Sequence, residues 1–277
     1  MKYLIIDATN LLYRTWHVTQ QAPADILILT YLRSIRKYLN EFKPDACYSV
    51  SDKRLIHGVK NYRRQDAEYK QNRDKSLWQS VHESEDTIEQ LTAHLGIINM
   101  FPGILEADDV IAYLCNALQG HKTVVSTDND MAQLVSEDTQ LYSPVKKILV
   151  TLENFEQHYA VSKNRFLLYK SIIGDAADNI KGIPGYGKVK AKKLTEHFEQ
   201  EHHKLTEEHK KTLKYNLEMV DLKHGLKVHP EEEAVYKEQL DSKVPNANFE
   251  AFLNLCKELK MQSIVSDASS WSHLLSS

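Results

Sequence analysis

The chain has little cysteine, no long hydrophobic run and almost no net charge across its 277 residues. Its three cysteines, Cys47, Cys115 and Cys256, are far apart in apolar contexts, which excludes a disulfide framework and a cysteine metal site. A reducing, cytoplasmic compartment is therefore expected. The longest apolar stretches, such as residues 26–29, are too short to span a bilayer, and MKYLIIDATN lacks the pattern of a signal peptide. We expect no membrane association.

Acidic residues recur at the ends of short apolar runs, in five clusters. A carboxylate just past a buried strand is costly to desolvate and repels its neighbours unless a cation compensates. Ligand sets made only of oxygen favour hard cations such as Mg²⁺ or Mn²⁺. The clusters therefore suggest a two-metal site for phosphoryl transfer. They comprise Asp7, Asp52, Glu106, Asp108, Asp109, Asp128, Asp130, Asp175 and Asp178.

Two basic segments are hidden by the net charge of −3. Without the nine clustered acids, the remainder of the chain carries +6. Residues 52–75 contain eight basic and four acidic residues, and residues 181–193 contain five lysines and no acid. Local basic stripes matter more for phosphate binding than the total charge, so a nucleic-acid partner is indicated.

The first 150 residues alternate apolar strands with helical patterns, which implies a parallel sheet with helices on both faces. Ligands of such sheets gather beyond the carboxyl ends of the strands, where Asp7, Asp52 and Asp128 would lie. From about Thr151 the chain becomes mainly helical, and its last sixteen residues read as a tail. Strands are expected at 3–7, 46–50, 97–100, 123–127, 140–144 and 147–150, and helices at 25–42, from Ser84 as N-cap, from about 107, and at 251–261.

A glycine- and lysine-rich segment follows Asp175 and Asp178. Gly185 and Gly187 permit a tight turn between two helices, with backbone amides free to approach a phosphate. The lysines that begin the next helix would contact phosphates without reading bases. We interpret residues 182–191, which follow these acids, as a duplex-binding element of the helix-hairpin-helix type; the alternative is a plain turn before a solvated helix.

Basic residues alternate with tyrosines between Lys53 and Lys75. This pattern suits single-stranded nucleic acid, because bases stack on the rings while phosphates pair with the cations. Lys70 and Arg73 lie three residues apart, so on a helix they would share one face and stabilise charge developing on a phosphate. A solvated helix face is the alternative.

Taken in order, these motifs resemble the 5′-nucleases over roughly residues 1–195. This family includes the flap endonucleases, the 5′-exonuclease domains of bacterial DNA polymerase I, and stand-alone phage enzymes such as phage RNase H. The motifs are DATNLLYR from Asp7, SDK around Asp52, YKQNR from Tyr69, EADD from Glu106, STDND around Asp128, and GDAADNIKGIPGYGKVKA from Gly174.

The resemblance implies an architecture and a set of roles. Residues 1–150 would form a PIN-like α/β nuclease core with a helical arch at about 53–82. Residues 151–277 would form a helical region with a helix-three-turn-helix motif at about 170–198 and a C-terminal extension. Asp7, Asp52, Glu106, Asp108 and Asp109 would surround the first metal ion, and Asp128, Asp130, Asp175 and Asp178 the second.

It also implies catalytic and DNA-binding residues. Tyr69, Lys70 and Arg73 would be catalytic, with Tyr69 stacking on a flap base. A K⁺ ion is expected near Ile183 and Tyr186 in the helix-three-turn-helix. DNA would be bound by Lys53, Arg63, Arg64, Lys170, Gly185, Gly187, Lys188, Lys190 and Lys192.

The implied activity is a Mg²⁺-dependent, structure-specific 5′-nuclease, with Mn²⁺ as a substitute. It would cleave 5′ flaps, 5′ ends or RNA primers near junctions of single and double strands. Expected partners are branched or nicked DNA, RNA–DNA hybrids, and replication proteins such as a single-strand-binding protein or a polymerase. The chain would act as a monomer in the cytoplasm of a bacterium or phage-infected cell.

Two alternatives stay open. A PIN-type ribonuclease shares the sheet and the acidic pocket, but gives no reason for the GIPGYGKVKA element. A catalytically silent module that binds DNA junctions would need neither the full complement of acids nor Lys70.

Overall fold

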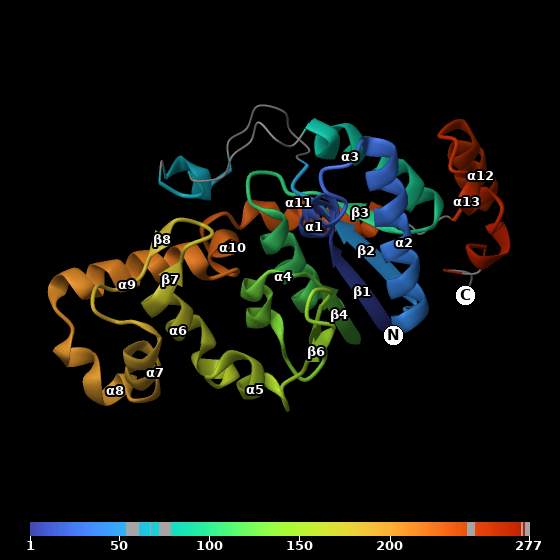
Figure 1. Cartoon of the computed structure of the whole chain (residues 1–277). Coiled ribbons are helices and arrows are strands. Elements are labelled where there is room, and N and C mark those ends of the chain that lie inside the picture. Colours follow the sequence, from blue (N-terminus) through green and yellow to red (C-terminus); the bar gives the residue numbers. More distant parts are fainter. Residues whose placement is uncertain (54–60, 67, 72–78, 243–246, 273, 275–277) are drawn as a thin grey trace.

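A six-stranded sheet forms the centre of the molecule in the computed structural model, which describes residues 1–53, 61–66, 68–71, 79–242, 247–272 and 274 (Figure 1). The strand order is β3-β2-β1-β4-β5-β6. The first five strands are parallel and β6 is antiparallel to β5, so the predicted, mainly parallel sheet is confirmed. The strands are β1 (Lys2–Asp7), β2 (Ala46–Val50), β3 (Ile98–Met100), β4 (His121–Val125), β5 (Thr139–Ser143) and β6 (Ile148–Val150).

Helices cover both faces of this sheet, which is why β1, next to its centre, is apolar from Tyr3 to Ile6 rather than alternating with polar residues. Alternate side chains of β1 enter different cores: Leu4 and Ile6 enter one, Ile5 the other. The first core includes side chains of α1 (Ala8–Val18), α2 (Ala24–Phe42) and α3 (Gln79–His94). The second includes those of α4 (Ala107–Ala117) and α11 (Glu231–Ser242).

A helical arm extends to one side of the sheet and contains its own small core (Figure 1). A short antiparallel hairpin, β7 (Gly174–Asp175) with β8 (Ile180–Lys181), carries the acids of the GDAAD motif. Buried Ile172, Leu194 and Leu213 join three of the arm's helices. The helices of the arm are α5 (Phe155–Tyr159), α6 (Phe166–Ile173), α7 (Lys188–Glu196), α8 (Phe198–Glu201) and α9 (Glu207–Val220).

The last helices return to the sheet instead of ending as a tail. After α10 (His224–Val228) and α11, the helices α12 (Phe249–Glu258) and α13 (Gln262–Val265) complete the first core. The expectation of a tail was wrong: Trp271 is only 2% exposed, with its ring 5.5 Å from that of Phe252 and the Arg36 guanidinium above it. The helical region after residue 150 therefore contains both an arm and a part of the core.

Two further local expectations differ from the structure. α3 begins at Gln79, so Ser84 lies inside the helix, where its hydroxyl donates to the Ser80 carbonyl rather than capping. α1 was not foreseen, because its first turn reads as the polar DATN turn. No helix in the described part of the chain is long and apolar enough to cross a bilayer.

Replacing Trp271 with alanine is expected to lower the free energy of unfolding by about 3–5 kcal/mol, because it removes a buried indole and leaves a cavity. Urea unfolding measures the loss. Leu152→Ala serves as the control: Leu152 is 40% exposed, and its truncation should change stability by less than about 0.5 kcal/mol. Equal effects of the two substitutions would show that the C-terminal helices do not stabilise the core.

Candidate active site

The acids of the first two motifs and of STDND lie at one edge of the sheet. Asp7 is the last residue of β1, Asp52 follows β2, and Asp128 follows β4. β2 and β4 flank β1 on opposite sides, so the strand order reverses direction at β1. Such a reversal opens a crevice at the carboxyl ends of the strands, where ligands of open α/β sheets bind.

Asp7 is held rigidly. It caps α1 by accepting a hydrogen bond from the Asn10 amide at 3.1 Å, and the Ser126 hydroxyl donates to its other oxygen at 2.7 Å. Burial raises the pKa of Asp7 to about 7, with smaller contributions from Asp128 and Asp52, despite those hydrogen bonds. Neither Asn10 nor Ser126 was singled out from the sequence, although both lie within the acidic motifs.

Asp52 is exposed and lies beside the start of α4. Its side chain accepts a hydrogen bond from the Ala107 amide at 2.9 Å, and its own amide donates to the Thr9 hydroxyl at 2.7 Å. The loop after β2 is thereby fixed to both α1 and α4. The second motif is thus brought against the EADD motif, as the sequence predicts.

Glu106, the N-cap residue of α4, is surrounded by donors. Lys70 Nζ lies 2.9 Å from Oε1, the Tyr69 hydroxyl donates to Oε2 at 2.8 Å, and Arg63 Nη1 lies 3.6 Å from Oε2. Burial favours the neutral carboxyl, but Lys70 and Arg63 outweigh it and lower the pKa of Glu106 to about 2. Glu106 is therefore ionised in this arrangement.

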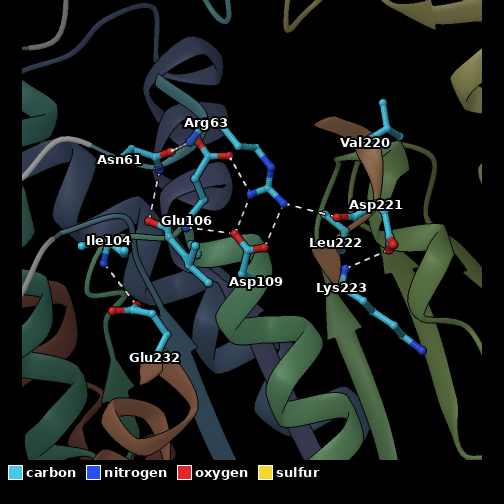
Figure 2. A network of polar contacts seen from close by, with 12 residues as sticks. Asn61, Arg63, Ile104, Glu106, Asp109, Val220, Asp221, Leu222, Lys223 and Glu232 are labelled. Carbon is cyan, nitrogen blue, oxygen red and sulfur yellow. Dashed lines mark hydrogen bonds and ion pairs between the residues drawn. The ribbon is translucent and has the colours of Figure 1, made fainter. Parts of the chain in front are cut away.

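The two adjacent aspartates of EADD have different surroundings. Burial raises the pKa of Asp108, and the nearby Asp7 and Asp128 carboxylates raise it further. Asp109 is fully buried and binds Arg63 through both oxygens, at 2.6 and 2.9 Å, while the Glu106 amide donates to Oδ2 at 3.0 Å (Figure 2). Asp108 thus joins the acidic cluster, whereas Asp109 is engaged by protein groups.

A second lysine connects the acids of β4 with those of the hairpin. Lys170 Nζ lies 2.7 Å from Asp130 Oδ1 and 2.6 Å from Asp175 Oδ2. Burial raises the pKa of Asp130 to about 7, and Asp128 adds to this, while Lys170 opposes it. Asp128 accepts a hydrogen bond from the Asp130 amide at 2.8 Å. Lys170, predicted to contact DNA, is buried between carboxylates in this structure.

Tyr69 and Lys70 reach the acids from the segment before α3. The Tyr69 hydroxyl is 3.2 Å from Asp178 as well as 2.8 Å from Glu106, and Lys70 Nζ is 3.8 Å from Asp178. Tyr69 is only 6% exposed, which differs from the predicted stacking on a flap base: its hydroxyl is bound by two carboxylates. Arg73 lies outside the described residues.

The predicted duplex-binding element has an open surface. Gly185 has a left-handed φ of +81°, and nothing lies within 4 Å of the position that a Cβ would take at Gly185 or Gly187. The following lysines Lys188, Lys190 and Lys192 are exposed on α7. At the predicted K⁺ position, the Ile183 carbonyl accepts a hydrogen bond from the Tyr186 amide at 3.1 Å.

The three basic residues predicted to contact DNA near the predicted arch differ in their exposure and in their partners. Lys53 is ion-paired with Asp86 at 2.7 Å and Glu89 at 2.5 Å. Arg63 is 3% exposed and its guanidinium is buried against Asp109, which differs from the predicted contact with DNA. Arg64 is partly buried.

Three side chains that position these loops gave no signal in the sequence. Asn216 of α9 donates to the Ser171 carbonyl at 2.7 Å and to the Lys181 carbonyl at 2.9 Å, which fixes the hairpin to α6. Glu232 of α11 accepts from the amides of Gly103 and Ile104 at 3.0 and 3.1 Å. Gln239 binds both backbone groups of Phe101. Each serves backbone groups, which sequence patterns do not reveal.

The carboxylates at the sheet edge are ligands that suit a hard divalent cation, although several of them contact Lys70 or Lys170 in this structure. No three His, Cys, Asp or Glu side chains of the described residues form a ready-made metal-binding group. Asp7, Asp108 and Asp128 offer only oxygen ligands. Burial and, to a smaller extent, mutual repulsion raise the pKa of each carboxyl, so a nearby cation would stabilise their ionised forms. Mg²⁺ and Mn²⁺ prefer such ligands.

Comparison with known sequences identifies relatives. Residues 2–160 match the model of the 5′-3′ exonuclease, N-terminal resolvase-like domain. Flap endonuclease Xni of Shewanella loihica is 30% identical over 202 residues, covering 71% of this chain and 77% of the relative. Flap endonuclease Xni of Vibrio atlanticus is 32% identical over 197 residues, covering 69% and 75%.

Solved structures share the fold along nearly the whole chain. T5 5′-exonuclease with bound zinc ions aligns with a TM-score of 0.67 at 20% identity, covering 94% of this chain and 99% of that one. Flap endonuclease-1 from Methanococcus jannaschii aligns with a TM-score of 0.58 at 13% identity, covering 99% and 92%. With the sheet, the acidic edge and the helical arm in place, the family match shows that this chain belongs to the 5′-3′ exonuclease family with an N-terminal resolvase-like domain.

Proposed function

We propose that this protein is a structure-specific 5′-nuclease that hydrolyses phosphodiesters at 5′ flaps, 5′ ends or RNA primers. The observation that carries the proposal is the position of Lys70 and Lys170 among acids from three separate motifs: Glu106, Asp130, and the pair Asp175 and Asp178. The exposed lysines of α7 follow in the same arm. Metal-binding acids beside phosphate-binding cations are what phosphodiester hydrolysis requires.

We expect two divalent ions at this edge of the sheet. Asp7, Asp52, Glu106 and Asp108 would hold the first, and Asp128, Asp130, Asp175 and Asp178 the second. Mg²⁺ is the expected ion, with Mn²⁺ able to replace it. When bound, the ions supply Lewis-acid stabilisation of the attacking and leaving oxygens of the phosphate.

The side chains of the protein orient the substrate and balance its charge. Lys70, which lies 2.9 Å from Glu106 Oε1, would place a positive charge beside the scissile phosphate and stabilise the charge that develops on it. Asn10 and Ser126 hold Asp7, and Lys170 holds Asp130 and Asp175 in register. These contacts fix the carboxylates of Asp7, Asp130 and Asp175 before a substrate binds.

Duplex binding would be the task of α7 and the turn before it. Backbone amides at Gly185 and Gly187 and the side chains of Lys188, Lys190 and Lys192 would contact phosphates without reading sequence. The carbonyls of the same turn would hold a K⁺ ion near Ile183 and Tyr186. Cleavage would then fall where this duplex meets a single strand, and polymerases or single-strand-binding proteins are the expected partners at such junctions.

A cleavage assay tests the proposed function. The substrates are 5′-labelled flap, nicked and RNA-primed duplexes together with a structureless RNA, each with Mg²⁺ and with EDTA. We expect Mg²⁺-dependent cuts near the junction of the duplexes. Preferential cleavage of the structureless RNA would support a PIN-type ribonuclease instead, and binding without cleavage would support a silent junction-binding module.

Asp130→Asn and Asp178→Asn are each expected to lower turnover by about 10- to 100-fold while DNA binding in EDTA stays measurable, because an amide is a poorer metal ligand than a carboxylate. Single-turnover cleavage and fluorescence anisotropy measure the two quantities. Asp241→Asn, at an exposed site on α11, is the control with unchanged turnover. Wild-type turnover in the first two variants would refute the second-site assignment.

In the metal-free protein, the free energy of unfolding is expected to fall as the pH rises from about 4 to about 7. Burial raises the pKa of Asp7 and Asp130 to about 7, so the folded chain retains protons that the unfolded chain releases near pH 4. Urea titrations in EDTA measure this slope. Mg²⁺ should raise the unfolding temperature more at about pH 8 than at about pH 5, because protons compete for the same oxygens. A flat or rising profile in EDTA would contradict the prediction.

A further inference from the structure

The segment before Lys70 is fastened to the loop that leads into α4. The Asn61 side chain donates to the Leu105 carbonyl at 3.1 Å and accepts from the Arg63 amide at 2.8 Å (Figure 2). The Tyr62 amide donates to the Ile104 carbonyl at 2.8 Å. Arg63 therefore enters the protein from a backbone that is already fixed, which favours one orientation of its side chain.

The guanidinium of Arg63 joins three parts of the protein. It makes a two-pronged contact with Asp109 in the first turn of α4, and Nη2 donates to the Asp221 carbonyl at 3.3 Å, between α9 and α10 (Figure 2). Nη1 also lies 3.6 Å from Glu106 Oε2. One buried cation thus links the segment before α3, the acidic motif and the base of the helical arm.

Asp109 is fully enclosed by residues that the structure describes. Arg63 and the Glu106 amide occupy its two oxygens, and its residue has no exposed surface. α10 approaches so closely at Gly225 that a Cβ there would lie 2.6 Å from Asp109 Oδ1. Neighbouring residues of a helix face directions about 100° apart, so Asp108 and Asp109 cannot both face the acidic edge.

We propose that Arg63 and Asp109 are a pair of positioning residues for the nuclease reaction, and that Asp109 is not a metal ligand. The pair fixes Glu106 at the acidic edge and holds the α9–α10 junction against α4. This role presupposes the proposed nuclease function. It replaces two separate roles expected from the sequence, a DNA contact for Arg63 and a metal contact for Asp109.

A double-mutant cycle of Arg63→Gln and Asp109→Asn tests the pair. Each single substitution is expected to lower kcat on flap DNA by about 10- to 100-fold with little change in KM, as loss of an outer-shell partner does. The double variant should be no slower than the slower single variant, because the two residues act as one unit. Multiplied losses in the double variant would overturn the proposal.

Stability separates positioning from simple unfolding. Arg63→Gln leaves a buried carboxylate without its partner and should lower the unfolding temperature by about 10 °C. The double variant removes both charges and should regain most of that loss, yet remain slow. If its kcat recovers together with its stability, the pair serves folding alone and the proposal fails.

Metal binding without DNA gives a readout that does not depend on cleavage. Calorimetric titration with Mn²⁺ should show the same number of bound ions in wild type, Arg63→Gln and Asp109→Asn, with affinity weakened by the same factor in both variants. Loss of an ion in Asp109→Asn alone would make Asp109 a ligand. This comparison holds even if wild type fails to cleave flap DNA, an outcome that would refute only the proposed function.

Two more variants complete the design. Arg63→Lys keeps the buried charge but loses the two-pronged contact, so it should fold if Arg63→Gln does not, and its kcat should still fall. Full activity in Arg63→Lys would contradict the geometric role. Arg165→Gln is the matched control: Arg165 makes a similar two-pronged contact with Glu199, at 2.8 and 3.1 Å, on the exposed side of the arm, and its loss should leave kcat unchanged.

Discussion

The burial of several carboxylates side by side is the constraint on which the rest of this molecule depends. Burial raises the pKa of Asp7 and Asp130 to about 7, and repulsion from the neighbouring Asp128 carboxylate adds to it, so the acids at the sheet edge cannot all ionise unless cations neutralise them. Two lysines neutralise part of this negative charge, and each of them contacts one acid of the sheet core and one acid of the helical arm. Lys170 connects Asp130 with Asp175, and Lys70 connects Glu106 with Asp178. The lysines that neutralise the carboxylates at the sheet edge therefore also hold the helical arm against the core.

The segment containing Tyr69 and Lys70 lies between these two parts and is bound to both. Its Asp66 accepts from the Tyr215 hydroxyl of α9 at 2.7 Å, and the Glu68 carbonyl accepts from the Asn179 side chain at 2.8 Å. On its other side, Tyr69 and Lys70 bind Glu106 of α4. A shift of the arm would thus move the segment relative to the acids. The proposed duplex binding on α7 would be physically linked by this route to the geometry of the acids at the sheet edge.

Much of the fold and the acidic site could be predicted from the sequence, because both follow from local patterns. Apolar runs mark buried strands, and parallel strands bring Asp7, Asp52 and Asp128 to one edge. The orientation of individual side chains could not. Arg63 and Arg64 are adjacent basic residues in a basic stretch, so the sequence does not distinguish them. Arg63 is the buried one because its guanidinium pairs with Asp109, which is distant in sequence. The burial of Tyr69 and of Trp271 was not foreseen for the same reason: their partners are distant in sequence.

The adjacent aspartates of the EADD motif have two different roles. Asp108 lies among carboxylates, where its charge is costly without an external cation. Asp109, one residue later, has an internal cation in the Arg63 guanidinium, and this carboxylate raises the pKa of Arg63 against the opposing effect of burial. A buried ion pair adds little net stability, since desolvation offsets the attraction, but it is strongly directional. Because Arg63 also lies near Glu106 and binds the Asp221 carbonyl, the value of the pair lies in geometry: it sets where the N-terminus of α4 stands relative to the arm.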